Sequence, residues 1–488
     1  MGLDDLFFRM FPKTAAKLAS RAYDAAIPDG YRPPIGSTGS GDALTGAAGE
    51  KLRNLGRHLE ENHDLSVAIL DDLVTNIVGV GLEARPMVRT LDGKLAKDFN
   101  RYLSEMFEMV GEDPEVTGDY TLNEASRQIV RATFRDGEIF IREVSHERRY
   151  QYPTEIPFAF QLLETDFCPW ELVDVERGIV HGVERNSWGR PTAYHFFREH
   201  PGDNLVGSYH SYDTKRIPAQ YVIQPKFSRR VRQARGVSLF HAVINRLRDL
   251  KDYEESERIA AKVAADMTAY IERTGEYRGE VKNGKRSFKF GAGMIWQLLP
   301  GEKVGSLKSE RPNPNLGEFR KQMMSAISGG TSTRRSSITR DYSGTYSSQR
   351  QELVESAIAY RAHFQYFARR VFTELYRRII MRGLNAGVIA TPTNIELSTL
   401  YRVDFRAPAL PWIDPQKEAK AWRELVESKL ESRAEIQRQR GRDPQKVLEE
   451  LEEESEIDVY ASAITAAGNE PAENDELEEK ADDEEAAA

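Results

Sequence analysis

Cysteine is almost absent from this chain of 488 residues, where Cys168 is the single example. One cysteine cannot form a disulfide within the chain and cannot build a cysteine-based zinc site, so a reducing compartment is expected. No run approaches eighteen apolar residues, which argues against a transmembrane helix. The first residues lack a basic segment followed by an apolar stretch, so no signal peptide is expected.

Signature motifs of common enzymes are also missing. The chain has no Gly-x-x-x-x-Gly-Lys-Ser/Thr loop, which argues against a P-loop ATPase, and no Gly-x-Ser-x-Gly nucleophile elbow. Gly79 and Gly81 follow a predicted helix and not a strand, so they do not form a dinucleotide-binding loop. His58 and His63 are five residues apart, which is not the spacing of a helical metal site. We therefore expect no metal and no cofactor.

Acidic residues are unevenly distributed. The formal net charge is −9, but residues 448–488 hold 17 Asp and Glu against one Lys and contribute −16. The rest of the chain therefore carries +7. A solvated acidic end is the simplest interpretation. A basic body is also compatible with contact to nucleic acid.

Apolar spacing predicts a mixed α+β chain of several domains. Steps of three and four predict helices over residues 46–78, 94–111, 121–134, 239–268, 316–328, 347–383 and 414–430. Short β-branched runs between residues 138 and 222 predict a small sheet, with a hairpin turn at residues 186–191. Residues 269–311 are strand-like, and residues 329–344 form a polar, basic, glycine-containing stretch that predicts a loop.

Three ordered stretches resemble the lambda-type portal family of tailed bacteriophages and prophages. Residues 73–82 are similar to a helix that ends in a Val-Val-Gly-x-Gly element, and residues 412–444 to a C-terminal Asp-Pro…Ser-Arg…Gly-x-Asp pattern. The most specific stretch is 341–350, where Thr345 replaces the more usual Asn. Its motif residues are Asp341, Tyr342, Tyr346, Ser347, Ser348 and Arg350.

The resemblance implies an elongated α+β subunit whose parts follow one another along the chain. The implied parts are a flexible N-terminal segment 1–45, a wing 46–242, a first stem helix 243–268, a β-rich clip 269–313, a second stem helix 314–329, a tunnel loop 330–346, a long wing helix 347–385, a wing return segment 386–413, a helical crown 414–445 and a disordered acidic tail 446–488.

The resemblance also implies a function that is not enzymatic. Such subunits form a ring, typically of twelve copies, at one vertex of the virion capsid after assembly in the host bacterial cytoplasm. Double-stranded DNA passes through the ring during packaging and ejection, without sequence specificity. The implied protein partners are the terminase large subunit, head-completion or adaptor proteins, and the major capsid and scaffold proteins. No membrane contact is implied.

Two basic groups are candidate sites on this interpretation. In the implied tunnel loop, Arg334, Arg335 and Arg340, with Ser336 and Thr339, would contact DNA phosphates, since phosphate contacts give affinity without reading bases. In the implied clip, the basic residues would dock the terminase and the connector proteins. These clip residues are Lys282, Lys285, Arg286 and Lys289. The simpler alternative for both groups is a solvated surface.

A metal-dependent nuclease is the alternative function. Asp266, Glu280 and Lys282 match an Asp…Glu-x-Lys spacing, in which two carboxylates hold Mg²⁺ and the lysine assists the attacking water. The pattern is short and arises often by chance. Asp266 is also expected at a helix end, whereas such a site needs a core strand.

Overall fold

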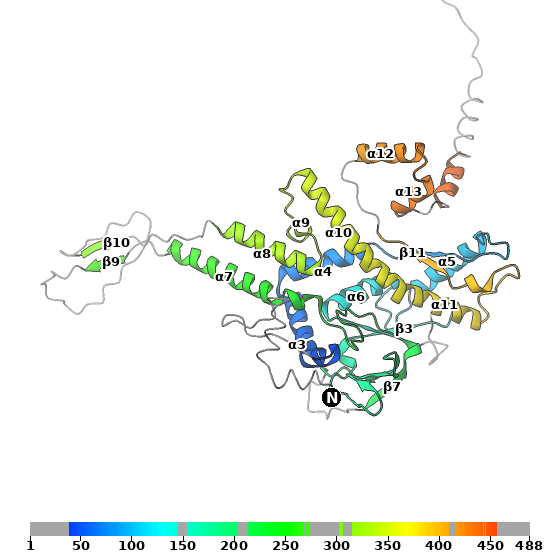
Figure 1. Ribbon diagram of the computed structural model, residues 1–488, viewed down its shortest axis with the longest axis horizontal. Coiled ribbons are helices and arrows are strands. Elements are labelled where there is room, and N and C mark those ends of the chain that lie inside the picture. The colour runs from blue at the N-terminus through cyan, green and yellow to red at the C-terminus, as the bar shows by residue number, and fades with distance from the viewer. Residues whose placement is uncertain are drawn as a thin grey trace, which may run out of the picture. The chain divides into compact units, whose positions relative to one another are not determined.

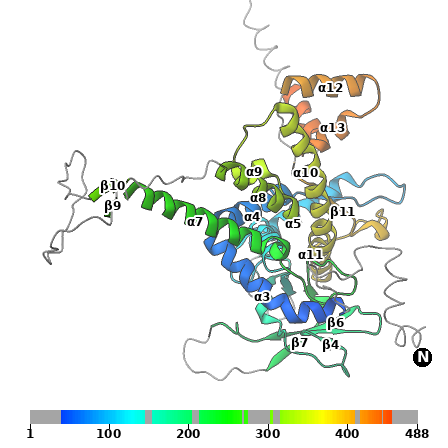
Figure 2. The ribbon, with the colours of Figure 1, turned by 60° about the vertical axis from the view of Figure 1, so that its left-hand side comes forward.

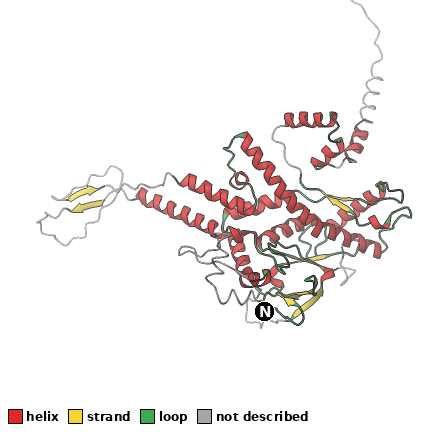
Figure 3. Ribbon diagram, viewed as in Figure 1, coloured by secondary structure: helices red, strands yellow, loops and turns green. Residues whose placement is uncertain are grey.

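The computed structural model describes residues 39–144, 152, 154–203, 213–266, 270–273, 302–305, 315–408, 415–442, 444 and 446–455. Helices predominate in this part of the chain, and the strands form small antiparallel sheets (Figure 3). The chain divides into two compact units. One comprises residues 1–74, 109–352 and 381–390, and the other residues 75–108, 353–380 and 391–488. Among the described residues, none of the helices is long and apolar enough to cross a lipid bilayer.

Among its described residues, the first unit combines helices with three small antiparallel sheets (Figure 1). Its first helices are α3 (Gly41–Asn62), α4 (Asp64–Ile77, in this unit to Val74) and α6 (Leu122–Arg135). One sheet has the order β3 (Phe160–Leu163), β2 (Phe140–Glu143), β8 (Val222–Ile223). A second sheet has the order β4 (Ile179–Val180), β5 (Val183–Arg185), β6 (Pro191–Phe197), β7 (Thr214–Pro218). Short 3₁₀ turns lie at Thr165–Phe167, Ala219–Tyr221 and Leu239–Ala242.

Local signals explain the starts and turns of several elements. Thr121 and Glu124 form a reciprocal capping box at the start of α6. Asn186 closes the β5–β6 hairpin, because its side-chain oxygen accepts from the backbone N–H groups of Trp188 and Arg190 at 3.0 and 2.9 Å. The expected hairpin at residues 186–191 is therefore confirmed.

The predicted helix over residues 46–78 is wrong in one respect, because it is two helices. His63 has extended backbone angles between α3 and α4, and its buried ring bonds the carbonyl oxygen of Leu247 at 3.0 Å. A partner 184 residues away is invisible to apolar spacing. The helix expected from Leu239 is likewise divided into a 3₁₀ turn capped by Ser238 and α7 (Ile244–Asp266).

Helices α7 and α8 (Leu316–Thr331) lie side by side in the first unit (Figures 1 and 2). The rings of Tyr253 and Phe319 meet edge to face at 5.0 Å, and Arg320 pairs with Glu254. Between these helices in sequence, β9 (Tyr270–Arg273) and β10 (Glu302–Gly305) pair antiparallel. The other residues of the 269–313 region lie outside the described part of the chain.

The segment expected as a loop, residues 330–346, is a loop interrupted by helical turns. Helix α8 continues through Gly329 and Gly330 to Thr331, and a short helix α9 covers Arg335–Thr339. Helix α10 (Tyr346–Phe367), a π-helical turn at Ala368–Phe372 and α11 (Thr373–Asn385) then form one uninterrupted helical stretch. The long helix predicted over residues 347–383 is thus confirmed, with an irregular turn inside it.

The second unit is built around a pair of short strands and aromatic contacts. Strand β1 (Ala84–Pro86) pairs antiparallel with β11 (Val403–Phe405). Helix α5 (Lys97–Gly111) belongs to this unit up to residue 108 and contributes Phe107. The Phe107 ring lies 5.6 Å from Tyr376 and 6.0 Å from Phe405, between ring centroids. A 3₁₀ turn at Leu397–Thr399 and helices α12 (Pro415–Glu427) and α13 (Arg433–Gln439) complete the unit.

The prediction of a disordered tail from residue 446 places its start too early in the sequence, because residues 446–455 are helical. Val447 is buried, Glu449 pairs with Arg101, and Lys446 lies 3.4 Å from Glu83. These contacts lie within the second unit. They explain why an acidic sequence remains ordered there.

A charged cluster joins α3 to the end of α6 in the first unit. The Asp136 carboxylate, whose side chain is 1% exposed, accepts two hydrogen bonds from Arg57 at 3.1 and 2.8 Å and two from Arg135 at 2.7 and 2.9 Å. Burial by itself would raise the pKa of Asp136, but the two guanidinium groups outweigh burial and hold that pKa below its usual value.

Acid should therefore destabilise this unit through Asp136. A carboxyl group whose pKa is lowered by folding stabilises the fold above its unfolded pKa near 3.8, and this stabilisation is lost as pH falls through the lower folded pKa. We expect the free energy of unfolding to decrease below about pH 4, and to do so less steeply in Asp136→Asn. Urea titrations from pH 7 downward measure both slopes. Equal slopes in the two proteins would contradict this assignment.

Candidate nucleic-acid interface

Polar side chains stabilise the turn between α8 and α9 internally. The hydroxyl groups of Thr331 and Thr333 are 2.7 Å apart, and the Ser328 hydroxyl donates to the backbone carbonyl of Thr333. Ser332 follows the helix in the left-handed conformation, with φ of 57°. Thr333 and Ser336 are buried. Ser336, which was expected to contact phosphate, is therefore packed inside the unit in this structure.

Arg334 is held against α4 by Asp72. Its Nη2 atom lies 3.5 Å from the Asp72 Oδ1 atom, and the two side chains are 17% and 4% exposed. The Ser337 hydroxyl donates to the same carboxylate oxygen. Asp72 and Arg334 come from distant parts of the sequence, so no local pattern indicates this contact. Arg334 is not presented to solvent as a free phosphate ligand.

Arg335 and Arg340 differ from Arg334 in exposure. Arg335 lies 3.6 Å from Asp341 and is about three-quarters covered. Asp341 also accepts from Ser343, which together with Arg335 holds the pKa of Asp341 below its usual value. Arg340 is exposed and ends α9 in the left-handed conformation, with φ of 55°. Of the three predicted arginines, Arg340 is therefore the one open to an incoming anion. Thr339 is partly buried and donates to the carbonyl of Arg335 at 2.9 Å.

The motif at residues 341–350 forms the exposed start of α10. Thr345 caps this helix, since its hydroxyl oxygen accepts from the Ser348 backbone N–H at 3.4 Å. An Asn at this position would cap in the same way, so the departure from the family pattern is chemically mild. The Gln349 amide donates to the carbonyl of Tyr342, and Arg350 donates to the Tyr346 hydroxyl at 3.2 Å. Tyr342 and Tyr346 are 61% and 45% exposed. Ser347 is exposed as well.

The predicted clip residues cannot be placed. Lys282, Lys285, Arg286 and Lys289 lie outside the described part of the chain. The same is true of Glu280 in the nuclease alternative, while the backbone of Asp266 ends α7 and is not on a strand. The Asp…Glu-x-Lys constellation is thus not assembled among the described residues.

One group among the described residues has ligand atoms close enough for a metal ion, namely Glu164, Asp166 and His200. Arginines already contact both carboxylates. Arg57 Nη2 lies 2.7 Å from Asp166 Oδ2 and 3.4 Å from Glu164 Oε2, and Arg53 lies 3.1 Å from Asp166. A divalent cation would meet this positive charge, so the group is better described as an ion-pair cluster.

One basic segment was missed at the level of sequence. Residues 225–236 contain Lys226, Arg229, Arg230, Arg232 and Arg235 and no acidic residue. This run is more basic than the predicted loop, and charge patterning alone could have identified it. Its members have different roles in the structure, because Arg235 is fully buried whereas Arg229, Arg230 and Arg232 are exposed.

The described fold combines helices with small antiparallel sheets, and the motif at residues 341–350 forms the exposed start of a long helix. The family model described as phage portal protein, lambda family, matches residues 34–363. The chain belongs to this family, whose members are structural proteins of the phage particle. A "Probable portal protein" of Halomonas phage phiHAP-1 is 25% identical over 421 residues, which cover 83% of this chain and 80% of that protein.

Solved structures show more distant likeness. A chain from "Neck of empty GTA particle computed with C6 symmetry" has a TM-score of 0.46 and 12% identity, with 80% of this chain and 94% of that chain covered. A chain from "Virion of native gene transfer agent (GTA) particle" has a TM-score of 0.46 and 12% identity, with coverage of 83% and 99%. These likenesses are too weak to add to the family assignment. None of the comparisons supports the nuclease alternative.

Proposed function

We propose that this portal protein forms a ring of identical subunits, twelve in the family's usual arrangement, at one vertex of the capsid. The ring is the channel through which double-stranded DNA enters and leaves. The observation that carries the proposal is the exposed family motif. Tyr342 and Tyr346 are large aromatic side chains left open to solvent in the isolated chain, together with Val354 on the same helix. Exposed apolar side chains that gather into a patch mark a surface for a partner, here a second copy of the subunit.

The DNA contact is assigned to the segment around α9. Arg340 is its exposed cation, and each copy of the chain would add one such charge around the channel. Arg334 and Arg335 would join it only after leaving Asp72 and Asp341. Ser336 and Thr339 would contribute neutral hydrogen bonds from the same helix once it moves. Contacts of this kind bind phosphate without selecting a base sequence.

The docking roles are assigned to the clip. Lys282, Lys285, Arg286 and Lys289 would meet the terminase large subunit during packaging and the head-completion or adaptor proteins afterwards. The major capsid and scaffold proteins would surround the ring at its vertex. Assembly would take place in the host cytoplasm, and no enzymatic step is assigned to this chain.

Removing the Arg340 charge tests the DNA role. In Arg340→Asn, the new residue tolerates the left-handed backbone and lacks the charge. We expect rings with a central hole in negative-stain images and a substantial decrease in packaged DNA. The salt dependence of nonspecific DNA binding should also become shallower, by about one unit of slope for each phosphate that the variant no longer neutralises. Arg177→Asn is the control, because Arg177 is a highly exposed arginine of the β4 region.

Two results would count against the proposal in different ways. Normal packaging by Arg340→Asn rings would remove the DNA role from this segment and leave the ring intact. A compact monomer that cleaves DNA in the presence of Mg²⁺ would overturn the structural function and favour the nuclease.

A further inference from the structure

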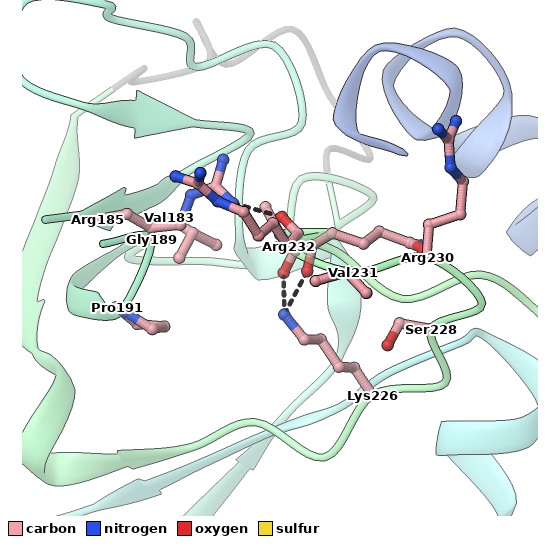
Figure 4. A pocket seen from close by; sticks show the side chains of 11 residues that line it. Val183, Arg185, Gly189, Pro191, Lys226, Ser228, Arg230, Val231 and Arg232 are labelled. Atoms are coloured by element: carbon pink, nitrogen blue, oxygen red, sulfur yellow. Dashed lines mark hydrogen bonds between the residues drawn. The ribbon is translucent and has the colours of Figure 1, made fainter. Parts of the chain in front are cut away.

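A cationic cavity lies in the first unit, between the β5–β6 hairpin and the segment that follows β8 (Figure 4). Its volume is about 210 Å³. The four charged residues among its lining side chains are all basic: Arg185, Lys226, Arg230 and Arg232. Pockets for drug-sized ligands are larger, about 300–1,000 Å³. A cavity of this size and sign suits a small anion.

Backbone contacts fix two of these cations in place. The Lys226 ammonium donates to the carbonyls of Gln233 and Ala234 at 2.6 and 3.0 Å (Figure 4). Arg185 donates to the Arg232 carbonyl at 2.7 Å and to the Asp42 carboxylate at 2.6 Å. These bonds hold the segment 226–234 in one shape, so the cavity is preorganised before any ligand arrives.

Arg232 and Arg230 point in different directions. The Arg232 guanidinium lies beside Gly189, where a methyl group on that residue would come within 3.2 Å of Nε. Arg230 extends away from Lys226 toward α3 and donates to the Gly39 carbonyl at 2.8 Å (Figure 4). The guanidinium group of Arg232 therefore lies at the cavity, whereas that of Arg230 contacts the backbone that precedes α3.

The charges at this place are not balanced by acidic groups of the lining. Asp42 offsets Arg185, and Glu138, which also acts on Lys226, is itself paired with buried Arg235. Burial lowers the pKa of Lys226. The neighbouring carboxylates raise this pKa, but by less than burial lowers it. Carbonyl oxygens solvate the ammonium but carry no net charge. The lining side chains therefore carry positive charge and no negative charge, which suits an anionic ligand.

We propose that this cavity binds a phosphoryl group, held by Arg232 and by the positive field of Lys226. A phosphate group is anionic, and its oxygens can accept two parallel hydrogen bonds from the fork of a guanidinium group. The group can be free phosphate or a phosphate of nucleic acid, and the chemistry of recognition is the same. The inference depends on neither the ring nor the α9 segment.

Calorimetric titration of the full-length protein with inorganic phosphate, at constant ionic strength, tests the cavity. Arg232 has φ of +63°, so Arg232→Asn removes the charge and keeps a residue that accepts this backbone. We expect saturable binding by the unmodified protein that is weaker by about tenfold or more in Arg232→Asn, as loss of a charge-assisted hydrogen bond requires. Arg190→Asn, an equal charge change on the exposed hairpin turn, should bind as the unmodified protein does.

Two further titrations identify the source of the phosphate. Binding of a short DNA duplex that weakens in Arg232→Asn and is displaced by phosphate would assign the group to nucleic acid. Duplex binding that is unaffected, with phosphate binding still lost, would assign it to a free phosphate. Phosphate binding that is absent, or equal in the unmodified protein and Arg232→Asn, would overturn the proposal. The proposal would also be overturned if the protein bound a polyglutamate peptide through Arg232 but did not bind phosphate.

Discussion

Replacement of Arg235 by methionine is expected to lower the free energy of unfolding of the first unit by about 3–5 kcal/mol. The Arg235 and Glu138 side chains are both 0% exposed and pair with each other. Arg235 also donates to the carbonyls of Cys168, His181 and Thr165 at 3.1, 2.7 and 3.1 Å. Methionine would leave these acceptors without a donor and the Glu138 carboxylate buried without its countercharge.

Urea denaturation measures this loss, and the Cys168 thiol reports it locally. Burial raises the pKa of this thiol to about 12, so it should resist alkylation at neutral pH in the native protein and react faster in Arg235→Met. Arg229→Met is the control on the same segment, because Arg229 is exposed and should change stability by no more than about 0.5 kcal/mol. Adding Glu138→Gln to Arg235→Met should recover part of the loss. A variant within about 1 kcal/mol of the unmodified protein would show that the pair contributes little.

Substitution of Gly236 by alanine is expected to be similarly damaging, at about 3 kcal/mol or more, for a steric reason. A Cβ atom on Gly236 would lie 1.9 Å from the carbonyl oxygen of Gly137 and 2.5 Å from its carbon. Both are backbone atoms, so no side-chain rotation relieves the clash. Gly137 itself has φ of +98°. A Cβ atom on Gly137 would lie 2.5 Å from the backbone nitrogen and carbonyl carbon of Val237. The two chain segments meet through glycine on both sides.

Gly329→Ala provides the matched control. A Cβ atom there meets nothing within 4 Å, and the position is helical, so alanine should be neutral or stabilising by up to about 1 kcal/mol. Thermal unfolding of the three proteins, with soluble yield recorded, separates the cases. Equal midpoints for Gly236→Ala and the unmodified protein would mean that the backbone at this junction can move apart without cost.

Prediction from sequence succeeded where the signal is local. The helix predicted from residue 121, the hairpin turn predicted at residues 186–191 and the long helix predicted over residues 347–383 each depend on local signals, and each is present. It failed where a distant partner decides the conformation. His63 breaks a predicted helix because its ring bonds the Leu247 carbonyl, and Val447 and Glu449 order a segment expected to be disordered.

The candidate site shows the same division. The sequence determined the family, through the motif at residues 341–350, and placed three arginines before it. Only the tertiary structure decided that Asp72 holds Arg334, that Asp341 contacts Arg335 and that Arg340 is exposed. It also decided that Arg235 is a buried core residue while Arg232, on the same segment, lines a cavity. Charge and composition are properties of the chain, whereas burial and pairing depend on which distant backbone and side chains arrive beside each residue.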